Sequence, residues 1–405
     1  MKVLHLNQTD ISGGASIAGY RLHQGLLNQK IDSRLLVGQV TTKSDRAATI
    51  KRKYRIENQI FRVTRRVGLN YLYLISSFDI PQQNFYKNAD ILNFHNLHSD
   101  YFNYLVIPSL TANKPAVYTL HDMWSFTGHC AYSYDCDRWK IGCGKCPYPD
   151  IYPGIERDNT HLEWKLKNWI YQHSQLTIVT PSRWLTEQAQ KSMFQHLNIH
   201  HIPYGIDTAA YQPLDGEKCR DLLGIPKDKK VLLCSGQAVT DSRKGADLLL
   251  KSLEKLPASL KAETILMTFG YGGAALPEIG MPILDLGYIS GDRLKSIAYS
   301  AADLFIFPTR ADNLPLMLQE SMACGTPMVS FKVGGVPDLV RPGITGYLAT
   351  ATDTEDFAQG IVQLWEDNQL RQQMSQQCRA IAITEYTLEM QAKRYIDLYQ
   401  QLLEN

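Results

Sequence analysis

The stretch FIFPTRADNLPLMLQESMACGTPMVSFKVGGVPDLVRPGITG, residues 305–346, decides the fold of this chain. The apolar run Leu304–Phe307 predicts a buried strand, and residues 316–323 predict the helix that follows it. A second short strand is predicted at Pro327–Phe331, ahead of a turn at Gly334-Gly335. A strand, a loop and a helix in this order leave free backbone N–H groups at the helix start, which suits a phosphate.

Two carboxylates flank the start of this predicted helix. Asp312 precedes the loop Asn313-Leu314-Pro315, which opens the helix, and Glu320 lies eight positions after Asp312. A carboxylate accepts hydrogen bonds from the neighbouring hydroxyls of a sugar. A phosphate site beside a polyol site predicts a nucleotide sugar as the ligand. Two acids taken alone are also typical of an ordinary helix surface.

These residues resemble the retaining family-4, or group 1, glycosyltransferases. That family carries Glu-x7-Glu, here Asp312-x7-Glu320, and a Gly-Gly-x-Pro-[Glu/Asp] run, here Gly334-Gly335-Val336-Pro337-Asp338. The resemblance covers most of the chain. It implies an α/β chain with the GT-B fold, in which two Rossmann-like domains with parallel sheets face each other across a cleft that holds the active site. The first acid departs from the family pattern, since Asp is one methylene shorter than Glu. This bears on the identity of the sugar but not on the class of reaction.

Composition limits the other possibilities. The 405 residues suit two or three domains, and hydrophobic and charged contents of 44% and 20% are typical of a globular protein. A net charge of +2 argues against a nucleic-acid binder. The N-terminus turns polar after six residues and no run of 18 apolar residues occurs, so we expect neither a signal peptide nor a membrane-spanning helix. The expected location is the cytoplasm, with reduced thiols and a peripheral position at the inner membrane face as a further expectation.

Strand-like apolar runs alternate with amphipathic stretches in two series, which predicts two parallel α/β domains. A junction is predicted at 202–207, where Pro and Gly punctuate the chain. The resemblance assigns 1–204 to an acceptor-binding domain and 205–385 to a nucleotide-sugar-binding domain. It makes 386–405 a helix that returns to the first domain. The predicted strands begin at Val3, Ser33, Ile91, Ala116 and Leu176 in the first series, and at Val231, Thr264, Ile283, Leu304 and Pro327 in the second.

A basic pair, Arg243-Lys244, precedes Gly245 after the first strand of the second series. The departure of a nucleoside diphosphate requires positive charge, because negative charge builds up on its oxygens. The family often has Arg just after the Gly of this strand and Lys just before a later Gly. Lys244 matches the second position, but Gln237 stands at the first. Arg243 either supplies the missing charge or points away into solvent.

Two further loops are candidates for donor binding. Gly13-Gly14 follows the first strand, where glycines let the backbone approach a phosphate; a plain tight turn is the alternative. The resemblance places this loop against the donor diphosphate or the reacting centre. Gly287, Tyr288 and Ile289 resemble the loop whose backbone contacts the nucleobase.

Three histidines follow strands of the first series. His121 ends the strand from Ala116, where ligands of parallel sheets bind, and a histidine there can exchange hydrogen bonds with a hydroxyl. The family has a histidine at the matching position, near the donor sugar. His95 and His98 follow the preceding strand and are candidates for the acceptor side. A structural role is the alternative for each.

Four cysteines between 130 and 146 form C-x5-C-x6-C-x2-C, namely Cys130, Cys136, Cys143 and Cys146. Clustered thiolates in a reducing compartment favour a structural zinc ion, and two disulfides or four free thiols are the alternatives. A subset of the family carries a similar insert.

Residues 51–66 are strongly basic, with aromatic residues interleaved. A basic, partly amphipathic segment can lie on an anionic membrane surface, and the family often uses lipid-linked acceptors. A solvated helix face is the alternative. The basic residues are Lys51, Arg52, Lys53, Arg55, Arg62, Arg65 and Arg66.

The resemblance therefore implies a retaining glycosyltransferase that moves a hexose to a glycan or lipid-linked acceptor, and the family favours UDP-glucose as donor. Lys244, Arg243, His121 and Asp312 are the predicted catalytic residues, and Glu320 is assigned to the ribose. No nucleophilic carboxylate stands out, so the resemblance implies displacement on one face of the sugar, without a metal cofactor for catalysis. Alternatives are a non-catalytic GT-B protein that binds a glycan or partner, and an epimerase or phosphorylase on the same fold.

Overall fold

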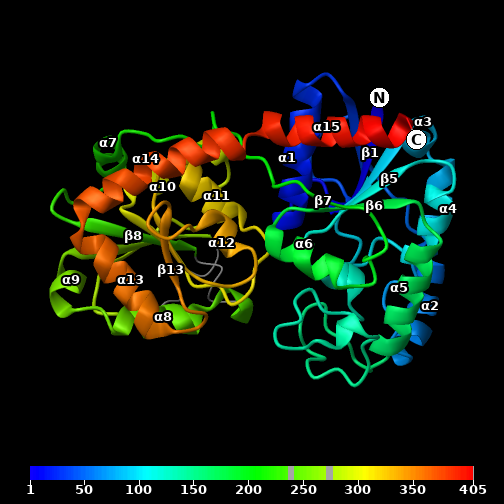
Figure 1. The fold of residues 1–405 in the computed structure, drawn as a ribbon, viewed down its shortest axis with the longest axis horizontal. Helices are drawn as coiled ribbons and strands as arrows, with labels where there is room; N and C mark the ends of the chain where they lie inside the picture. The colour runs from blue at the N-terminus through cyan, green and yellow to red at the C-terminus, as the bar shows by residue number, and fades with distance from the viewer. Residues whose placement is uncertain (236–240, 271–276, 405) are drawn as a thin grey trace. The chain divides into compact units, whose positions relative to one another are not determined.

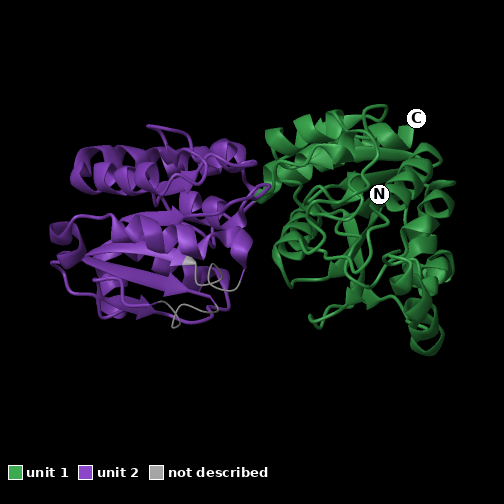
Figure 2. Ribbon diagram, turned by 90° about the horizontal axis from the view of Figure 1, so that it is seen from below, with its two compact units in different colours: residues 1–205, 388–405 green, residues 206–387 purple. Residues whose placement is uncertain are grey.

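The computed structural model describes residues 1–235, 241–270 and 277–404, and the chain forms two compact units (Figure 2). Unit 1 comprises residues 1–205 and 388–405, and unit 2 comprises residues 206–387. The division falls inside the segment 202–207, where proline and glycine interrupt the pattern of strands and helices.

Unit 1 is built on a seven-stranded sheet in which every pair of neighbouring strands is parallel, with the order β3-β2-β1-β4-β5-β6-β7. Five of these strands match predicted ones to within a few residues. The three-residue strands β3 and β7 were not predicted, because segments this short carry no periodic pattern. The strands are β1 Lys2–Thr9, β2 Asp32–Gln39, β3 Ala47–Thr49, β4 Ile91–Phe94, β5 Ala116–Thr119, β6 Leu176–Thr180 and β7 Ile199–His201.

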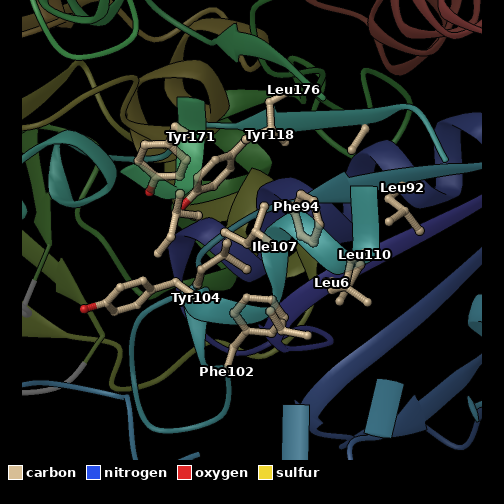
Figure 3. Packing of buried hydrophobic residues seen from close by; sticks show 14 of the residues in the cluster. Leu6, Leu92, Phe94, Phe102, Tyr104, Ile107, Leu110, Tyr118, Tyr171 and Leu176 are labelled. Atoms are coloured by element: carbon tan, nitrogen blue, oxygen red, sulfur yellow. The ribbon is translucent and has the colours of Figure 1, made fainter. Parts of the chain in front are cut away.

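The two faces of this sheet are covered differently. Alternate residues such as Val3, Ile91 and Val117 pack with α1 and α15 on one face. The other face carries the larger core, in which Leu6, Leu92, Phe94 and Tyr118 meet Tyr104 and Tyr171 (Figure 3). The helices of unit 1 are α1 Gly14–Asn28, α2 Tyr54–Arg66, α3 Asn84–Asn88, α4 Ile107–Thr111, α5 Thr160–Gln172, α6 Arg183–Gln190 and α15 Leu388–Glu404.

The C-terminal helix α15 belongs to unit 1, although it follows unit 2 in the sequence (Figure 1). Its hydroxyl groups bond to the sheet: Tyr399 Oη lies 2.6 Å from Asn93 Nδ2, and Tyr395 Oη lies 2.9 Å from Thr119 Oγ1. These bonds give hydrogen-bond partners to the buried polar side chains of the strands, so the helix can cover this face of the sheet.

Unit 2 contains a six-stranded parallel sheet with the order β10-β9-β8-β11-β12-β13. The strands are β8 Lys230–Ser235, β9 Thr264–Phe269, β10 Ile283–Asp285, β11 Leu304–Phe307, β12 Met328–Phe331 and β13 Gly346–Ala349. The helices are α7 Gly216–Leu222, α8 Ala246–Glu254, α9 Ala258–Ala262, α10 Asp292–Ala301, α11 Leu316–Ala323, α12 Val336–Leu339, α13 Thr354–Glu366 and α14 Asn368–Glu385.

Both sheets are doubly wound. The strand order reverses between β1 and β4 in unit 1 and between β8 and β11 in unit 2. Ligands of such sheets bind outside the carboxyl ends of the strands where the order reverses. Across the described ranges, the structure contains no helix with the length and apolar character needed to span a bilayer.

Candidate active site

In unit 2 the reversal point gathers the predicted cations around one carboxylate. Lys244 Nζ lies 2.6 Å from Asp312 Oδ2, and Arg243 Nη1 lies 3.3 Å from the same oxygen. Arg243 also donates to the carbonyl oxygen of Ala311 at 2.9 Å and pairs with Asp241 at 3.0 Å. Arg243 therefore points into the cluster, so the solvent-facing alternative does not describe it. Gln237 falls outside the described residues.

The electrostatics of the cluster follow from its burial. Burial alone raises the pKa of the Asp312 carboxyl, but Lys244 and Arg243 outweigh it and hold that pKa below its usual value. Burial lowers the pKa of Lys244, while the charge of Asp312 opposes the shift. Asp312 is therefore ionised at neutral pH, and the cluster carries two cations against one nearby carboxylate and the more exposed Asp241.

Two glycines let the loops that carry this cluster approach each other closely. Gly245 has a φ of 74°, and a Cβ there would lie 2.0 Å from the Pro308 carbonyl oxygen. Gly334 has a φ of 50°, and its Cβ would lie 2.0 Å from the carbonyl oxygen of Asp312. The next residue, Gly335, donates its N–H to that same carbonyl at 3.1 Å. The Gly-Gly run thus positions the backbone of Asp312, because only glycine allows so close an approach.

Glu320 occupies the adjacent helix, α11. Its side chain is buried, and the hydroxyl of Tyr299 donates to its Oε2 at 3.3 Å. No side chain caps the start of α11 at Pro315, so backbone N–H groups remain available to an anion there. Asn313 lies in the loop before the helix, and its backbone N–H donates to Asp312 Oδ1 at 3.0 Å.

The candidate base-binding loop follows β10, at the far edge of the same sheet. Gly287 adopts a φ of 63°, its N–H donates to Asp285 Oδ1 at 3.2 Å, and its carbonyl accepts from Gly270 at 2.8 Å. The side chain of Tyr288 is 64% exposed. The loop is therefore held by the Asp285 carboxylate and by the backbone N–H of Gly270, and it continues through the exposed Tyr288 to Ile289.

In unit 1 the candidate phosphate loop is open. Gly13, with a φ of 86°, is the N-cap of α1, and no atom lies within 4 Å of a Cβ built at Gly13 or Gly14. The helix begins at Gly14, three residues before the predicted start at Ile17. Asp10 anchors the loop by accepting bonds from Thr41 and Thr42, and these bonds lower its pKa to about 2 although burial opposes them.

His121 lies at the carboxyl end of β5, as predicted, and both of its ring nitrogens are engaged. Its Nε2 lies 3.0 Å from His95 Nδ1, and its Nδ1 lies 2.6 Å from the hydroxyl of Tyr204. Burial lowers the pKa of His121 to about 4, so the ring is neutral at pH 7. Tyr204 was not among the predicted site residues, because it lies 83 residues from His121 and no local motif links the two.

The other two histidines are 2% exposed. His98 Nε2 bonds to Asp122 Oδ2 at 3.0 Å, and His95 is stacked between two other imidazoles. Both rings are buried in the structure, and the acceptor-side role of His95 and His98 stays a prediction.

The four clustered cysteines line a single pocket together with His129. His129 Nε2 lies 3.1 Å from Cys146 Sγ, and the Gly128 N–H donates to Cys143 Sγ at 3.2 Å. All four are free thiols in the structure. Within the described ranges, no set of three or more His, Cys, Asp or Glu side chains stands at metal-binding geometry.

Comparison with known proteins identifies the family of both halves. A model described as Glycosyltransferase Family 4 matches residues 12–210, and a model described as Glycosyl transferases group 1 matches residues 215–380. A protein of Escherichia coli (strain K12), named as glycosyl transferase WcaC of colanic acid biosynthesis, is 25% identical and aligns with 99% of this chain and 100% of its own length.

Solved structures show the same fold. A sucrose-phosphate synthase from Thermosynechococcus elongatus superposes with a TM-score of 0.71 at 16% identity, covering 100% of both chains. Anabaena Alr3699/HepE, solved in complex with UDP and glucose, superposes with a TM-score of 0.70 at 16% identity, covering 99% of this chain and 100% of that one. The chain therefore belongs to the group 1 glycosyl transferases of family 4 and is a glycosyltransferase with the GT-B fold.

Proposed function

We propose that this enzyme transfers a hexose, with retention, from a nucleoside diphosphate sugar to a glycan or lipid-linked acceptor in polysaccharide or glycoconjugate synthesis. The observation that carries the proposal is the convergence of Lys244 and Arg243 on Asp312 beside the uncapped start of α11. Fixed cations and helix N–H groups at one place match the charge of a departing diphosphate.

In the proposed reaction, the sugar leaves the diphosphate and joins the acceptor in one displacement. The bond between the anomeric carbon and the diphosphate oxygen breaks, and the electron pair leaves with the diphosphate. Lys244 and Arg243 stabilise that charge. The acceptor oxygen bonds to the same face of the anomeric carbon, and its proton passes to a diphosphate oxygen. Asp312 then holds sugar hydroxyls, Glu320 holds the ribose, and the backbone of 287–289 contacts the base.

UDP-glucose is the favoured donor. The Anabaena neighbour was solved with UDP and glucose, which supports this choice for a chain of the same fold. The test measures turnover and the shift of the thermal unfolding midpoint with UDP-glucose, UDP-galactose and GDP-mannose. A ligand that binds only the folded state raises the midpoint of the protein. We expect the largest shift with UDP-glucose and an α-linked product by NMR. A larger shift with GDP-mannose contradicts the donor assignment, and a β-linked product contradicts retention.

A structural zinc ion is the second part of the proposal. The turn 142–146 bends through four residues with positive φ and brings Cys143 and Cys146 to the pocket that Cys130 and Cys136 also line. Four thiolates are a typical zinc set. Since the side chains do not stand at ligand distances here, binding requires them to rotate inward.

Metal analysis tests the zinc site. We expect about one equivalent of zinc per chain, lost in Cys143→Ser and kept in Cys219→Ser, whose thiol lies in α7 of the other unit. A folded, metal-free preparation in which all four thiols react with a thiol reagent contradicts the site.

Helix α2 is proposed to contact an anionic membrane surface. Glu57 fixes its inner face by accepting from Ser76 N at 2.9 Å and by pairing with Arg52 at 2.5 Å. Arg55, Arg62 and Arg66 then share the outer face at helical spacing, and none has an ion-pair partner in the part of the chain that the structure describes. The exposed apolar residues beside this stripe are Ile56 and Val63.

Vesicle sedimentation tests this contact. The wild-type protein should sediment with vesicles that contain anionic lipid and remain in solution with neutral ones. Replacing Arg55, Arg62 and Arg66 with Glu should abolish sedimentation. The matched control replaces Lys30, Lys165 and Lys191, which are exposed elsewhere on unit 1, with Glu. Equal loss in both triple variants points to net charge alone and contradicts a role for α2.

A further inference from the structure

Polar residues occupy alternate positions on three neighbouring strands, on the sheet face that α1 and α15 cover. His5 pairs in register with Asn93 in the parallel ladder between β1 and β4. His95 follows β4, two positions after Asn93, and His121 follows β5, two positions after Thr119. Alternate residues share a face, so the sheet order alone brings three imidazoles together.

The three rings and one phenol form a continuous hydrogen-bonded chain. His5 Nδ1 lies 2.9 Å from His95 Nε2, and His95 Nδ1 lies 3.0 Å from His121 Nε2. His121 Nδ1 lies 2.6 Å from Tyr204 Oη. The rings stack with centroids 5.2, 5.3 and 5.5 Å apart. This order leaves every internal nitrogen engaged.

The helix α1 closes over this chain at a glycine. A Cβ at Gly19 would lie 2.9 Å from Asn7 Nδ2 and 3.4 Å from His95 Nδ1. Glycine therefore lets the helix approach the histidines without a gap, and burial lowers the pKa values of His5 and His95 well below their usual range. Both rings are neutral at pH 7, so each carries a single N–H.

A chain of neutral rings allows only two arrangements of protons. In the first, Tyr204 donates to His121, His121 Nε2–H donates to His95, and His95 Nε2–H donates to His5. In the second, His5 Nδ1–H donates to His95, His95 Nδ1–H donates to His121, and His121 Nδ1–H donates to Tyr204. The two differ at the end of the chain, because the first places a proton on His5 Nε2 and the second leaves a lone pair there.

The environment of His5 Nε2 distinguishes between the two proton arrangements. His5 Nε2 is buried and has no hydrogen-bond partner within the ranges that the structure describes. A buried N–H without an acceptor is rarer and more costly than an acceptor without a donor. We infer that His5 and His95 are positioning residues that hold His121 as an Nδ1–H tautomer, so that His121 offers a hydrogen-bond donor to an oxygen of the substrate.

This role rests on the proposed function, in which His121 faces a bound sugar. A hydroxyl or phosphate oxygen that takes the place of the Tyr204 hydroxyl then receives the hydrogen bond of a neutral ring. His121 orients the substrate as a donor and does not serve as a proton acceptor in this tautomer.

Nitrogen NMR of the protein labelled with ¹⁵N-histidine tests the inference directly, because long-range ¹H–¹⁵N correlations distinguish the two tautomers of each ring. Single replacements of His5, His95 and His121 assign the signals. We expect all three rings to be protonated at Nδ1 at pH 7. An Nε2–H tautomer or an imidazolium at His121 overturns the inference.

Two variants at His95 separate positioning from packing. His95→Asn keeps an amide N–H near the place of Nδ1, so it should preserve the tautomer of His121. His95→Leu removes the donor to His121 Nε2, so the Nδ1–H tautomer should be less strongly favoured than in the wild-type protein, with kcat lower by several-fold to about tenfold, the range for one hydrogen bond. Tyr204→Phe removes the acceptor of His121 Nδ1–H, so each arrangement then leaves one buried N–H unpaired and both sets of tautomers should be populated.

The outcomes distinguish this inference from the proposed function. Equal tautomers and equal turnover in His95→Asn and His95→Leu overturn the positioning role. Absence of turnover with every nucleotide sugar in the wild-type protein overturns the proposed function, while the ¹⁵N signals still decide the tautomer.

Discussion

Asp312 pairs with both Lys244 and Arg243 in one ion-pair cluster, at the place where we propose that the donor binds. The Asp that replaces the Glu of the family motif is shorter, and its carboxylate lies against Lys244. In the proposed donor complex, the diphosphate would compete with Asp312 for the ammonium group of Lys244. Under this proposal, donor binding and stabilisation of the leaving diphosphate use the same cation.

Lys244→Ala should lower turnover on the order of a hundredfold or more, because a fixed cation stabilises the transition state more than the ground state. Asp312 keeps Arg243 as a partner, so the thermal midpoint should change far less than the rate. Initial rates at saturating donor, together with thermal unfolding, provide the measurement. Arg243→Ala is the comparison, and a comparable loss is expected if Arg243 replaces the family's missing Arg. Near wild-type turnover in Lys244→Ala would place diphosphate stabilisation elsewhere.

Glu320→Gln should weaken UDP binding by about tenfold to a hundredfold, because a charged acceptor for the ribose hydroxyls becomes a neutral one. The change is nearly isosteric and Tyr299 still finds an oxygen, so the fold should be unaffected. Titration calorimetry measures the affinity. Tyr299→Phe is the control and should have the smaller effect. Unchanged affinity in Glu320→Gln would remove Glu320 from the ribose site.

Single residues could be singled out where a short sequence motif contains them, and their roles stay predictions. Asp312, Glu320 and Lys244 stand in short patterns, and the structure places Lys244 on Asp312. Their supporting partners were not predictable. Tyr204 meets His121 across 83 residues, and His5 meets His95 across 90, because strand order rather than sequence proximity joins them.

At the scale of elements, strands and helices were predicted correctly where a clear apolar run marked them. The strand β11 and the helix α11 were predicted with their observed bounds, since a buried four-residue run and a glycine stop define them clearly. The short strands β3, β7 and β13 were missed. The start of α1 was predicted three residues late, because Gly13 caps it with an unusual backbone angle rather than with a recognisable side chain.

Gly334→Ala tests whether the turn before α12 supports Asp312. The new Cβ would meet the Asp312 carbonyl, so we expect destabilisation on the order of 1–3 kcal/mol and a loss of donor binding as Asp312 shifts. Gly343→Ala is a matched control: its φ is also positive, at 75°, but nothing lies within 4 Å of its Cβ. Denaturant unfolding and nucleotide titration give the two measurements. Equal effects of both variants on binding would mean that backbone strain alone, and not the contact with Asp312, explains the result.

At the scale of the whole molecule, the two units share one architecture. Each unit has a doubly wound parallel sheet with its own core, and each places candidate ligand groups after the strands where the order reverses. The two series of apolar runs predicted both sheets, and the Pro and Gly of 202–207 marked the junction. The burial of polar histidines in unit 1 was not predictable, because it depends on α15 and α1 covering that face.

Those histidines make the stability of unit 1 sensitive to acid. Burial lowers the pKa of His121 and His23 to about 4, and Arg46 adds to the effect at His23; burial also lowers those of His5 and His95. Unfolded histidines titrate near 6.5, so below that pH the unfolded chain binds protons that the folded chain does not. Stability should fall as pH drops from about 6.5 to about 4, by as much as about 1.4 kcal/mol per pH unit for each histidine.

Urea unfolding monitored by tryptophan fluorescence measures this loss, because every tryptophan except Trp365 lies in unit 1. The midpoint should decrease between pH 7 and pH 5. His23→Gln, which removes one titrating ring outside the hydrogen-bonded chain, should flatten that decrease. The depressed pKa of Asp10 affects stability only at lower pH, between about 4 and about 2. It therefore does not contribute to the change between pH 7 and pH 5. A midpoint that stays constant from pH 7 to pH 5 would mean that the histidines are protonated in the folded protein, and that would remove the neutral rings on which the tautomer of His121 depends.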